Sequence, residues 1–277
     1  MEITKRAPRA PVITLVSDAG MGKTSLACLF PGETFMIRTE DGLESVPEEN
    51  QPDVSAMVDR EAVLWAQLKW LATEDHPYHN VVLDTVTRLD QLFIQSVIQA
   101  DAAAGGKIRS IQTAAGGYGA GMGQVASKHL SVRTALGKIN DRGITIIILA
   151  HAASEEFSPP DGDKYTRWNL KLDKKCISPY VDDVDLVGYI KLESYVKLLE
   201  GKMNEGKAGK VNDTGSRVIV CQATANNISK NRYGIKEPID YPEGVNPLLP
   251  YIPFYSYLFE ADPADDQQSD NSQEQQQ

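Results

Sequence analysis

Ser17-Asp18-Ala19-Gly20-Met21-Gly22-Lys23-Thr24 is the stretch that decides the fold of this chain. An apolar run over residues 11–16 precedes it, and residues 25–30 after it have the pattern of a short helix. A strand, a loop of small residues that ends in Gly-Lys-Thr, and a helix form the context of a phosphate-binding loop. Gly20 and Gly22 let successive backbone amides point at phosphate oxygens, and the helix N-terminus adds the positive end of its dipole. The stretch therefore predicts a P-loop.

The side chains of this loop have separate expected roles. Lys23 is expected to reach the β- and γ-phosphates of ATP and to act in catalysis, and the Thr24 hydroxyl is expected to ligate Mg²⁺. The usual pattern begins with glycine, and because Ser17 stands there instead, the entry turn of the loop is expected to differ slightly. The alternative is a strand–helix turn whose lysine and threonine are coincidental. The expected nucleotide-binding residues are Ser17, Asp18, Ala19, Gly20, Met21, Gly22, Lys23, Thr24 and Ser25.

The composition is that of a globular protein, and the length fits one large domain with additions or two modest domains. Hydrophobic residues make up 42% of the 277 residues and charged residues 24%. No apolar run reaches the about 18–20 residues of a membrane span, and no secretory signal pattern is present, so we expect a cytoplasmic protein without a membrane partner. The three cysteines have no metal-ligand spacing, so they are expected to be free thiols; Cys28 and Cys221, which lie in apolar elements, are expected to be buried.

The acidic charge is concentrated at the C-terminus. The net charge is −10, and residues 260–277 hold six acidic residues and no basic one. This Gln-rich tail has few apolar residues and is predicted to be disordered, which leaves residues 1–259 as the folded domain. Because the rest of the chain is nearly balanced in charge, a nucleic-acid surface is compatible with the composition only if it is local.

Strand and helix patterns alternate along the chain. This alternation predicts an α/β fold with a mostly parallel sheet, helices on both faces, and a C-terminal antiparallel extension. The glycine-rich residues 105–123 are expected to be a mobile loop, and residues 152–168 a polar loop. Strands are expected at 11–16, 33–38, 80–87, 144–151, 184–190 and 216–221, and the longer helices at 60–74, 89–104 and 124–140.

Three polar residues end predicted strands. Asp84 is expected to hold Mg²⁺, because ligands bind at the carboxyl ends of parallel strands; a helix-capping role is the alternative. Glu40 is the candidate to orient or deprotonate water, provided that its strand neighbours the first, and Asp41 competes for this role. His151 is a candidate catalytic sensor of the γ-phosphate, and a strand-end histidine with only structural hydrogen bonds is nearly as good an interpretation.

The order of these motifs resembles the RecA-type ATPase core. Residues 17–25 match the Walker A loop, and residues 81–86 resemble the Walker B strand. Residues 36–43 resemble the strand that ends in the catalytic glutamate, and residues 147–151 occupy the place of the sensor strand, with histidine where RecA proteins have glutamine. The motifs over residues 10–240 are most similar to those of phage-encoded RecA-like ATPases of the Sak single-strand-annealing group.

This resemblance implies a DNA path and a contact in trans. In RecA-like proteins, the segments that correspond to residues 105–123 and 152–170 line the path of DNA, and solvated loops are the alternative. Residues 229–234 are similar to a segment that reaches the nucleotide of a neighbouring subunit, which implies roles in trans for Lys230 and Arg232; an ordinary polar turn is the alternative. The implied DNA-binding residues are Lys107, Arg109, Lys164, Arg167, Trp168 and Lys171.

The expected function is that of an ATP- and Mg²⁺-dependent ATPase. The resemblance implies action on single-stranded DNA in phage recombination, by annealing or strand pairing, in the cytoplasm of a bacterial host. It also implies a homo-oligomer, as a ring or filament, and a possible single-strand-binding protein as partner of the acidic tail. A helicase-type motor and a nucleotide-gated DNA-binding module without turnover are the two rival functions.

Overall fold

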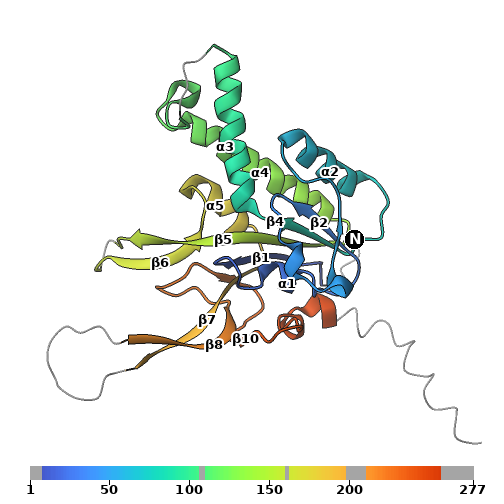
Figure 1. Cartoon of the computed structure of the whole chain (residues 1–277), viewed down its shortest axis with the longest axis vertical. Helices are drawn as coiled ribbons and strands as arrows, with labels where there is room; N and C mark the ends of the chain where they lie inside the picture. The colour runs from blue at the N-terminus through green and yellow to red at the C-terminus, as the bar shows by residue number, and fades with distance from the viewer. Residues whose placement is uncertain (1–7, 106–109, 160–161, 198–209, 257–277) are drawn as a thin grey trace, which may run out of the picture.

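The computed structural model describes residues 8–105, 110–159, 162–197 and 210–256. A mixed sheet of ten strands forms its centre (Figure 1), in the order β10-β8-β7-β1-β5-β4-β2-β3, with β6 paired to β5 and β9 to β7. The strands are β1 Val12–Ser17, β2 Thr34–Arg38, β3 Asp53–Val54, β4 Asn80–Asp84, β5 Thr145–Phe157, β6 Tyr165–Leu170, β7 Leu186–Lys197, β8 Lys210–Val220, β9 Lys230–Asn231 and β10 Ile239–Asp240.

Helices cover both faces of the sheet, as the sequence predicts. The longer helices pack on one face and α1 on the other, where the C-terminal segment joins it (Figure 1). The central strands are buried on both sides, and their apolar side chains alternate between two cores, one on each face. The helices are α1 Lys23–Ala27, α2 Glu61–Thr73, α3 Val86–Ala103, α4 Ala120–Asn140 and α5 Lys174–Val181, with 3₁₀ turns η1 Leu43–Ser45, η2 Glu48–Asn50, η3 Ala114–Gly116 and η4 Leu249–Tyr251.

Parallel pairing brings the polar strand ends to one edge of the sheet. Strands β7, β1, β5, β4 and β2 run parallel, and Ser17 of β1 lies opposite His151 of β5. Arg38 of β2 lies opposite Asp84, which ends β4. Because this order places β5 and β4 between β1 and β2, the condition set for Glu40, that its strand neighbours the first strand, is not met. Glu40 belongs instead to the turn after β2, beyond Thr39.

The antiparallel extension is present and returns to the P-loop. Strand β8 pairs antiparallel with β7, and β10 pairs antiparallel with β8. This route carries Arg217 and Tyr241 to the same side of the sheet as Gly22. The confirmed fold class is thus a mostly parallel α/β sheet with antiparallel strands added at its C-terminal end. The predicted acidic tail, residues 260–277, lies outside the described residues.

Two segments differ from their sequence-based interpretation. Residues 152–168 are not a polar loop, because β5 continues to Phe157 and forms a hairpin with β6. Cross-strand pairs such as Glu155 with Arg167 and Phe157 with Tyr165 stabilise this hairpin. Helix α4 begins at Ala120, so only part of residues 105–123 is irregular. No helix among the described residues is long and apolar enough to cross a membrane.

Candidate nucleotide-binding site

The P-loop has the backbone of an anion-binding cradle. Gly20 and Gly22 have φ values of 76° and 86°, a conformation that favours glycine. No described residue accepts a hydrogen bond from the backbone amides of residues 19–24, so these donors remain available to phosphate oxygens. Ser17 ends β1 as a buried strand residue, and glycine is therefore not required at this position. These observations fit a bound nucleotide phosphate.

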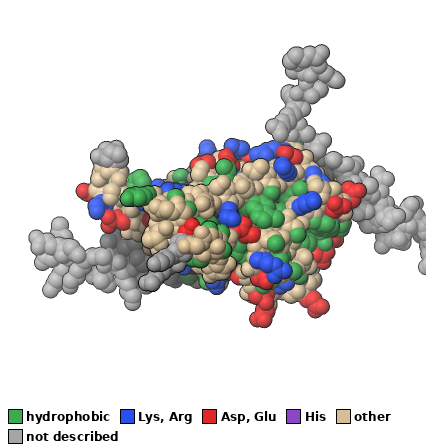
Figure 2. Space-filling view, turned by 90° about the horizontal axis from the view of Figure 1, so that it is seen from above, with side chains coloured by type: hydrophobic (Ala, Val, Ile, Leu, Met, Phe, Trp, Pro, Cys, Tyr) green, Lys and Arg blue, Asp and Glu red, His purple; other side chains and the backbone are tan. Residues whose placement is uncertain are grey.

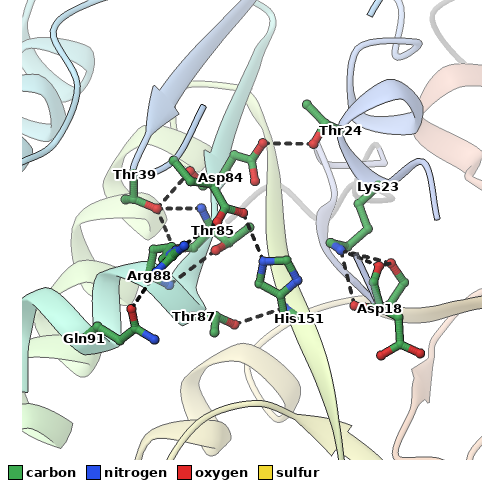
Figure 3. A network of polar contacts seen from close by, with 12 residues as sticks. Asp18, Lys23, Thr24, Thr39, Asp84, Thr85, Thr87, Arg88, Gln91 and His151 are labelled. Carbon is green, nitrogen blue, oxygen red and sulfur yellow. Dashed lines mark hydrogen bonds and ion pairs between the residues drawn. The ribbon is translucent and has the colours of Figure 1, made fainter. Parts of the chain in front are cut away.

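Lys23 is a buried ammonium group surrounded by neutral oxygens. Its Nζ donates to the Ser17 hydroxyl at 3.0 Å and to the carbonyls of Ser17 and Asp18 at 3.2 and 3.0 Å (Figure 3). Burial lowers the pKa of Lys23, and the nearby carboxylates of Asp84, Glu40 and Asp18 oppose that shift. No described carboxylate forms an ion pair with this buried cation, which fits an anionic ligand because a phosphate would supply the missing charge.

Thr24 and Asp84 converge from different elements. The Thr24 hydroxyl at the start of α1 donates to Asp84 Oδ2 at the end of β4 over 3.0 Å. Burial, together with the charge of Glu40, raises the pKa of Asp84 to about 6, against the hydrogen bond from Thr24 and the charges of Lys23 and His151, which lower it. A hydroxyl and a carboxylate oxygen form the donor set that Mg²⁺ prefers, and a divalent cation would compensate this buried charge. The two residues therefore fit the predicted magnesium site.

Glu40 and His151 meet above this site. His151 Nε2 donates to Glu40 Oε1 at 3.1 Å, and Arg88 Nε donates to Glu40 Oε2 at 3.2 Å (Figure 3). The hydrogen bond from His151 lowers the pKa of Glu40, with help from Arg88 and against the effect of burial. Glu40 is therefore an anion at neutral pH and is held at both oxygens. Its competitor Asp41 is 67% exposed in its side chain and pairs with Arg38 at 3.6 Å.

Three polar residues that were not singled out from the sequence position this network. Thr39 Oγ1 accepts from the Thr85 amide at 2.8 Å and lies 3.0 Å from the Asp84 carbonyl, which fixes the end of β2 against the end of β4. Thr87 Oγ1 accepts from the backbone amide of His151 at 3.0 Å. Arg88 lies one residue further along α3. The only sequence feature that could have indicated these residues is their position, because each follows a buried strand by only a few residues.

A second set of missed residues covers the P-loop from the C-terminal strands. Tyr241 donates to the Gly22 carbonyl at 2.9 Å, and the Arg217 guanidinium lies 4.5 Å from the centre of the Tyr241 ring. A Cβ at Gly22 would lie 2.5 Å from the guanidinium of Arg217 and 3.1 Å from the Tyr241 hydroxyl, so both side chains lie directly against the loop. Arg217 and Tyr241 line a cavity of about 120 Å³ with Ser25 of α1. They are about 200 residues distant along the chain, which is why no local motif indicated them.

The proposed DNA contacts are only partly free. Lys164 pairs with Glu156 at 2.8 Å, and Arg167 pairs with Glu155 at 3.1 Å. The half-buried Trp168 stacks on Tyr189, with ring centres 6.0 Å apart. No described carboxylate pairs with Lys171, whose backbone amide donates to the His151 carbonyl at 2.8 Å. Lys107 and Arg109 lie outside the described residues.

Lys230 and Arg232 lie far from the P-loop of their own chain. Arg232 Nη1 pairs with Asp185 Oδ1 at 2.8 Å, and Lys230 donates to the Asp182 carbonyl. The Asp185 amide donates to the Val12 carbonyl at the start of β1, whereas the P-loop follows the end of that strand. The two cations therefore lie near the amino-terminal ends of the parallel strands, opposite the ends that carry the P-loop, and contact no residue of the P-loop.

Comparison with known proteins assigns the family. The sequence model of a family described as an AAA domain matches residues 9–233. The chain belongs to this AAA domain family. Its membership and its P-loop together support a P-loop ATPase. No curated protein matches this AAA domain.

Two solved structures are distantly similar to this AAA domain. One is the flagellar accessory protein FlaH from Methanocaldococcus jannaschii, with 10% identity, coverage of 85% of this chain and 86% of that chain, and a TM-score of 0.39. The other is the KaiC-like protein PH0186 from Pyrococcus horikoshii OT3, with 11% identity, coverage of 87% and 89%, and a TM-score of 0.43. The family assignment rests on the sequence-family match.

Proposed function

We propose that this AAA domain hydrolyses ATP with Mg²⁺ and couples turnover to single-stranded DNA. The observation that carries the ATPase proposal is the convergence of Thr24 and Asp84 at 3.0 Å, beside Lys23 and below the Glu40–His151 pair. Together these groups supply a phosphate-binding cation, two oxygen donors for a metal ion and an anionic base.

Each side chain would serve a separate part of hydrolysis. The Lys23 ammonium would neutralise charge on the β- and γ-phosphates, and Thr24 and Asp84 would hold the metal ion. Bound Mg²⁺ supplies charge neutralisation at the phosphate oxygens. Glu40 would orient a water toward the γ-phosphorus and accept its proton as the bond to ADP breaks, giving ADP and inorganic phosphate. His151 would hold Glu40 in position and report the presence of the γ-phosphate.

The DNA part of the proposal rests on the hairpin that begins at His151. Strand β5 runs without interruption from His151 into the β5–β6 hairpin, which supports the proposal that a shift at the phosphate site would reach the hairpin. Lys171, at the end of β6, lines a cavity of about 290 Å³ that also includes His151 and Arg88. Figure 2 shows basic side chains interspersed with acidic ones on the face it presents, which favours a local DNA contact over a broad basic surface.

The biological role in this proposal is phage recombination by annealing or strand pairing. It follows from the resemblance of the motifs to the Sak group, and it includes assembly into a ring or filament in which Lys230 and Arg232 act on the nucleotide of a neighbouring copy. A cation supplied by a neighbour stabilises charge in the transition state, so hydrolysis would depend on assembly.

The deciding experiment is the ATPase rate with and without single-stranded DNA in the same salt. We expect DNA to raise the rate, and we expect Lys23→Ala to abolish turnover under both conditions. Unwinding of duplex DNA driven by ATP would indicate the helicase-type motor instead. ATP binding without turnover, even with DNA present, would indicate a nucleotide-gated binding module. Equal turnover with and without DNA would support ATP hydrolysis but contradict its proposed coupling to single-stranded DNA.

A further inference from the structure

A buried group of potential metal ligands lies outside the nucleotide site. Asp90 of α3, His129 of α4 and Cys176 of α5 each offer one donor atom, and these atoms all lie within 4.8 Å of one another. His129 and Cys176 are fully buried, and Asp90 is 8% exposed. A carboxylate, an imidazole and a thiol on three different helices form a mixed oxygen, nitrogen and sulfur donor set.

The imidazole of His129 is held in an orientation that suits metal binding. Its Nε2 lies 3.0 Å from Asp90 Oδ1, and its Nδ1 lies 2.7 Å from the Tyr180 hydroxyl. The ring also packs edge-to-face against Phe93 and Tyr180, with ring centres 5.1 and 5.5 Å apart. Histidine ligands of metal ions usually have such a partner on the second ring nitrogen, which fixes the tautomer and the ring plane.

The site also has a route to solvent. Asp90 lines a cavity of about 420 Å³ between α3 and the β5–β6 hairpin, which Asn169 and Lys171 also line. An ion can therefore approach from the Asp90 side, and the cavity has room for a water as a fourth ligand. The other two donors lie behind Asp90, in the packing of α3, α4 and α5.

We propose that Asp90, His129 and Cys176 bind one zinc-class divalent cation that joins α3, α4 and α5. Zinc accepts thiolate, imidazole and carboxylate ligands at about 2.0–2.3 Å, which places neighbouring ligands about 3.3–3.8 Å apart. Because all three separations are 4.8 Å or less, the donor atoms must move together by no more than about 1–1.5 Å to bind the ion. Hard cations such as Mg²⁺ are poor occupants because they do not favour sulfur, which separates this site from the predicted magnesium site.

Metal binding would replace the hydrogen bond between His129 and Asp90 by bonds to the ion and would release one proton. The Cys176 thiol loses its proton to solvent and binds as thiolate. His129 binds through the lone pair of Nε2, so its proton resides on Nδ1 and is donated to the Tyr180 oxygen. Asp90 binds through a carboxylate oxygen in place of its hydrogen bond from His129. No oxidant or other reactant is needed.

The ion would join α5, which follows the β5–β6 hairpin, to α3, which follows β4. Helix α5 follows β6 after a short turn, and α3 begins directly after Asp84 and Thr85. Fixing Asp90 to Cys176 would therefore stiffen the connection between these elements. The site itself does not depend on the proposed ATPase or DNA function, since its ligands lie outside the P-loop network.

Cobalt(II) spectroscopy on the full chain tests the proposal. The reduced, chelator-treated protein is titrated with Co²⁺ in excess Mg²⁺, which occupies the phosphate-side site. We expect a thiolate-to-cobalt charge-transfer band that saturates at one equivalent and disappears when Zn²⁺ is added. Thermal unfolding with and without Zn²⁺ should show a matching stabilisation, because the ion binds only the folded state. Absence of the band from the wild-type protein would overturn the proposal.

Matched variants locate the ion. Cys176→Ser should abolish the charge-transfer band, whereas Cys28→Ser and Cys221→Ser, which change the other two buried cysteines, should keep it. Tyr180→Phe retains all three ligands and should weaken Zn²⁺ binding about 10-fold by removing the partner of Nδ1. A band that persists in Cys176→Ser, or one that is lost equally in Cys28→Ser or Cys221→Ser, would assign the ion elsewhere and overturn the proposal.

Discussion

Asp84 is a buried carboxylate whose charged form is disfavoured by its burial. The residue is 3% exposed, and its pKa is raised from the ordinary 3.8 to about 6, mainly by burial. Between these two values the folded state keeps the proton and the unfolded chain releases it, so the free energy of unfolding falls as pH rises. Above pH 6 both states are ionised and the destabilisation is constant, at about 3 kcal/mol for about two pKa units.

Removing this charge should therefore stabilise the protein without ligand. We expect Asp84→Asn to raise the free energy of unfolding at pH 8 by up to about 3 kcal/mol, and the gain should shrink as pH falls from 6 toward 4. Urea unfolding in the absence of Mg²⁺ and nucleotide measures this difference, and ATPase activity should be lost in the same variant. A gain that is independent of pH would assign the stabilisation to packing rather than to the buried charge.

Glu40 and its neighbour Asp41 differ in their contacts, and the contacts of Glu40 are those expected of a catalytic base. Glu40 is held by His151 and Arg88, whereas Asp41 points to solvent. We expect Glu40→Gln to lower ATP turnover at least about 100-fold while nucleotide binding changes little, because only proton transfer is removed. Asp41→Asn is the matched control and should keep its turnover. Steady-state hydrolysis and binding of a fluorescent ATP analogue measure the two quantities.

At the scale of elements, the C-terminal strands complete the nucleotide site. Arg217 of β8 and Tyr241, which follows β10, cover Gly22 and line a cavity with Ser25. We expect Arg217→Ala to weaken ATP binding by about 2- to 10-fold through loss of the guanidinium and its contact with the tyrosine ring. Lys69→Ala removes an exposed positive charge on α2 and serves as the control. Equal affinity in both variants would exclude β8 from the site.

The elements that could be predicted from the sequence are those with strong local signals. Continuous β-branched runs indicated β1, β4 and β5, and helical spacing indicated α2 and α3, since burial alone decides these segments. The β5–β6 hairpin escaped prediction because its stability comes from cross-strand pairs such as Glu155 with Arg167, which a linear pattern does not reveal. Helix α5 escaped because Pro179 lies inside it and interrupts the helical pattern.

The residues of the candidate site also differ in whether a local sequence pattern indicates them. Lys23, Thr24, Asp84, Glu40 and His151 could be predicted because each lies at the end of a predicted strand or shortly after it, and parallel pairing brings these ends together. The residues that hold them, such as Thr39 and Thr87, needed the register of neighbouring strands. The contacts of Asp90 with His129 and of Tyr241 with Gly22 join distant segments, so only the folded chain reveals them.

At the scale of the whole molecule, the two ends of the parallel strands have different roles in the proposed assembly. The P-loop follows Ser17 at the carboxyl end of β1, and Arg232 pairs with Asp185 beside Val12 at its amino end. Five residues of strand separate these two ends by about 17 Å, which is beyond the reach of an arginine side chain. In the proposed assembly Arg232 would therefore contact the nucleotide of another copy rather than that of its own chain.

Mixing two inactive variants tests this arrangement. Lys23→Ala lacks a working P-loop but retains Arg232, and Arg232→Ala has the reverse defect, so each alone should be inactive. In a random assembly of equal amounts, about one interface in four combines an intact P-loop with an intact arginine, and activity should recover toward about a quarter of the wild-type rate. Recovery should require concentrations at which the chains assemble, as followed by light scattering. An Arg232→Ala protein with wild-type turnover would remove the residue from the mechanism, and two inactive variants that assemble without recovery would show that its role lies within its own subunit.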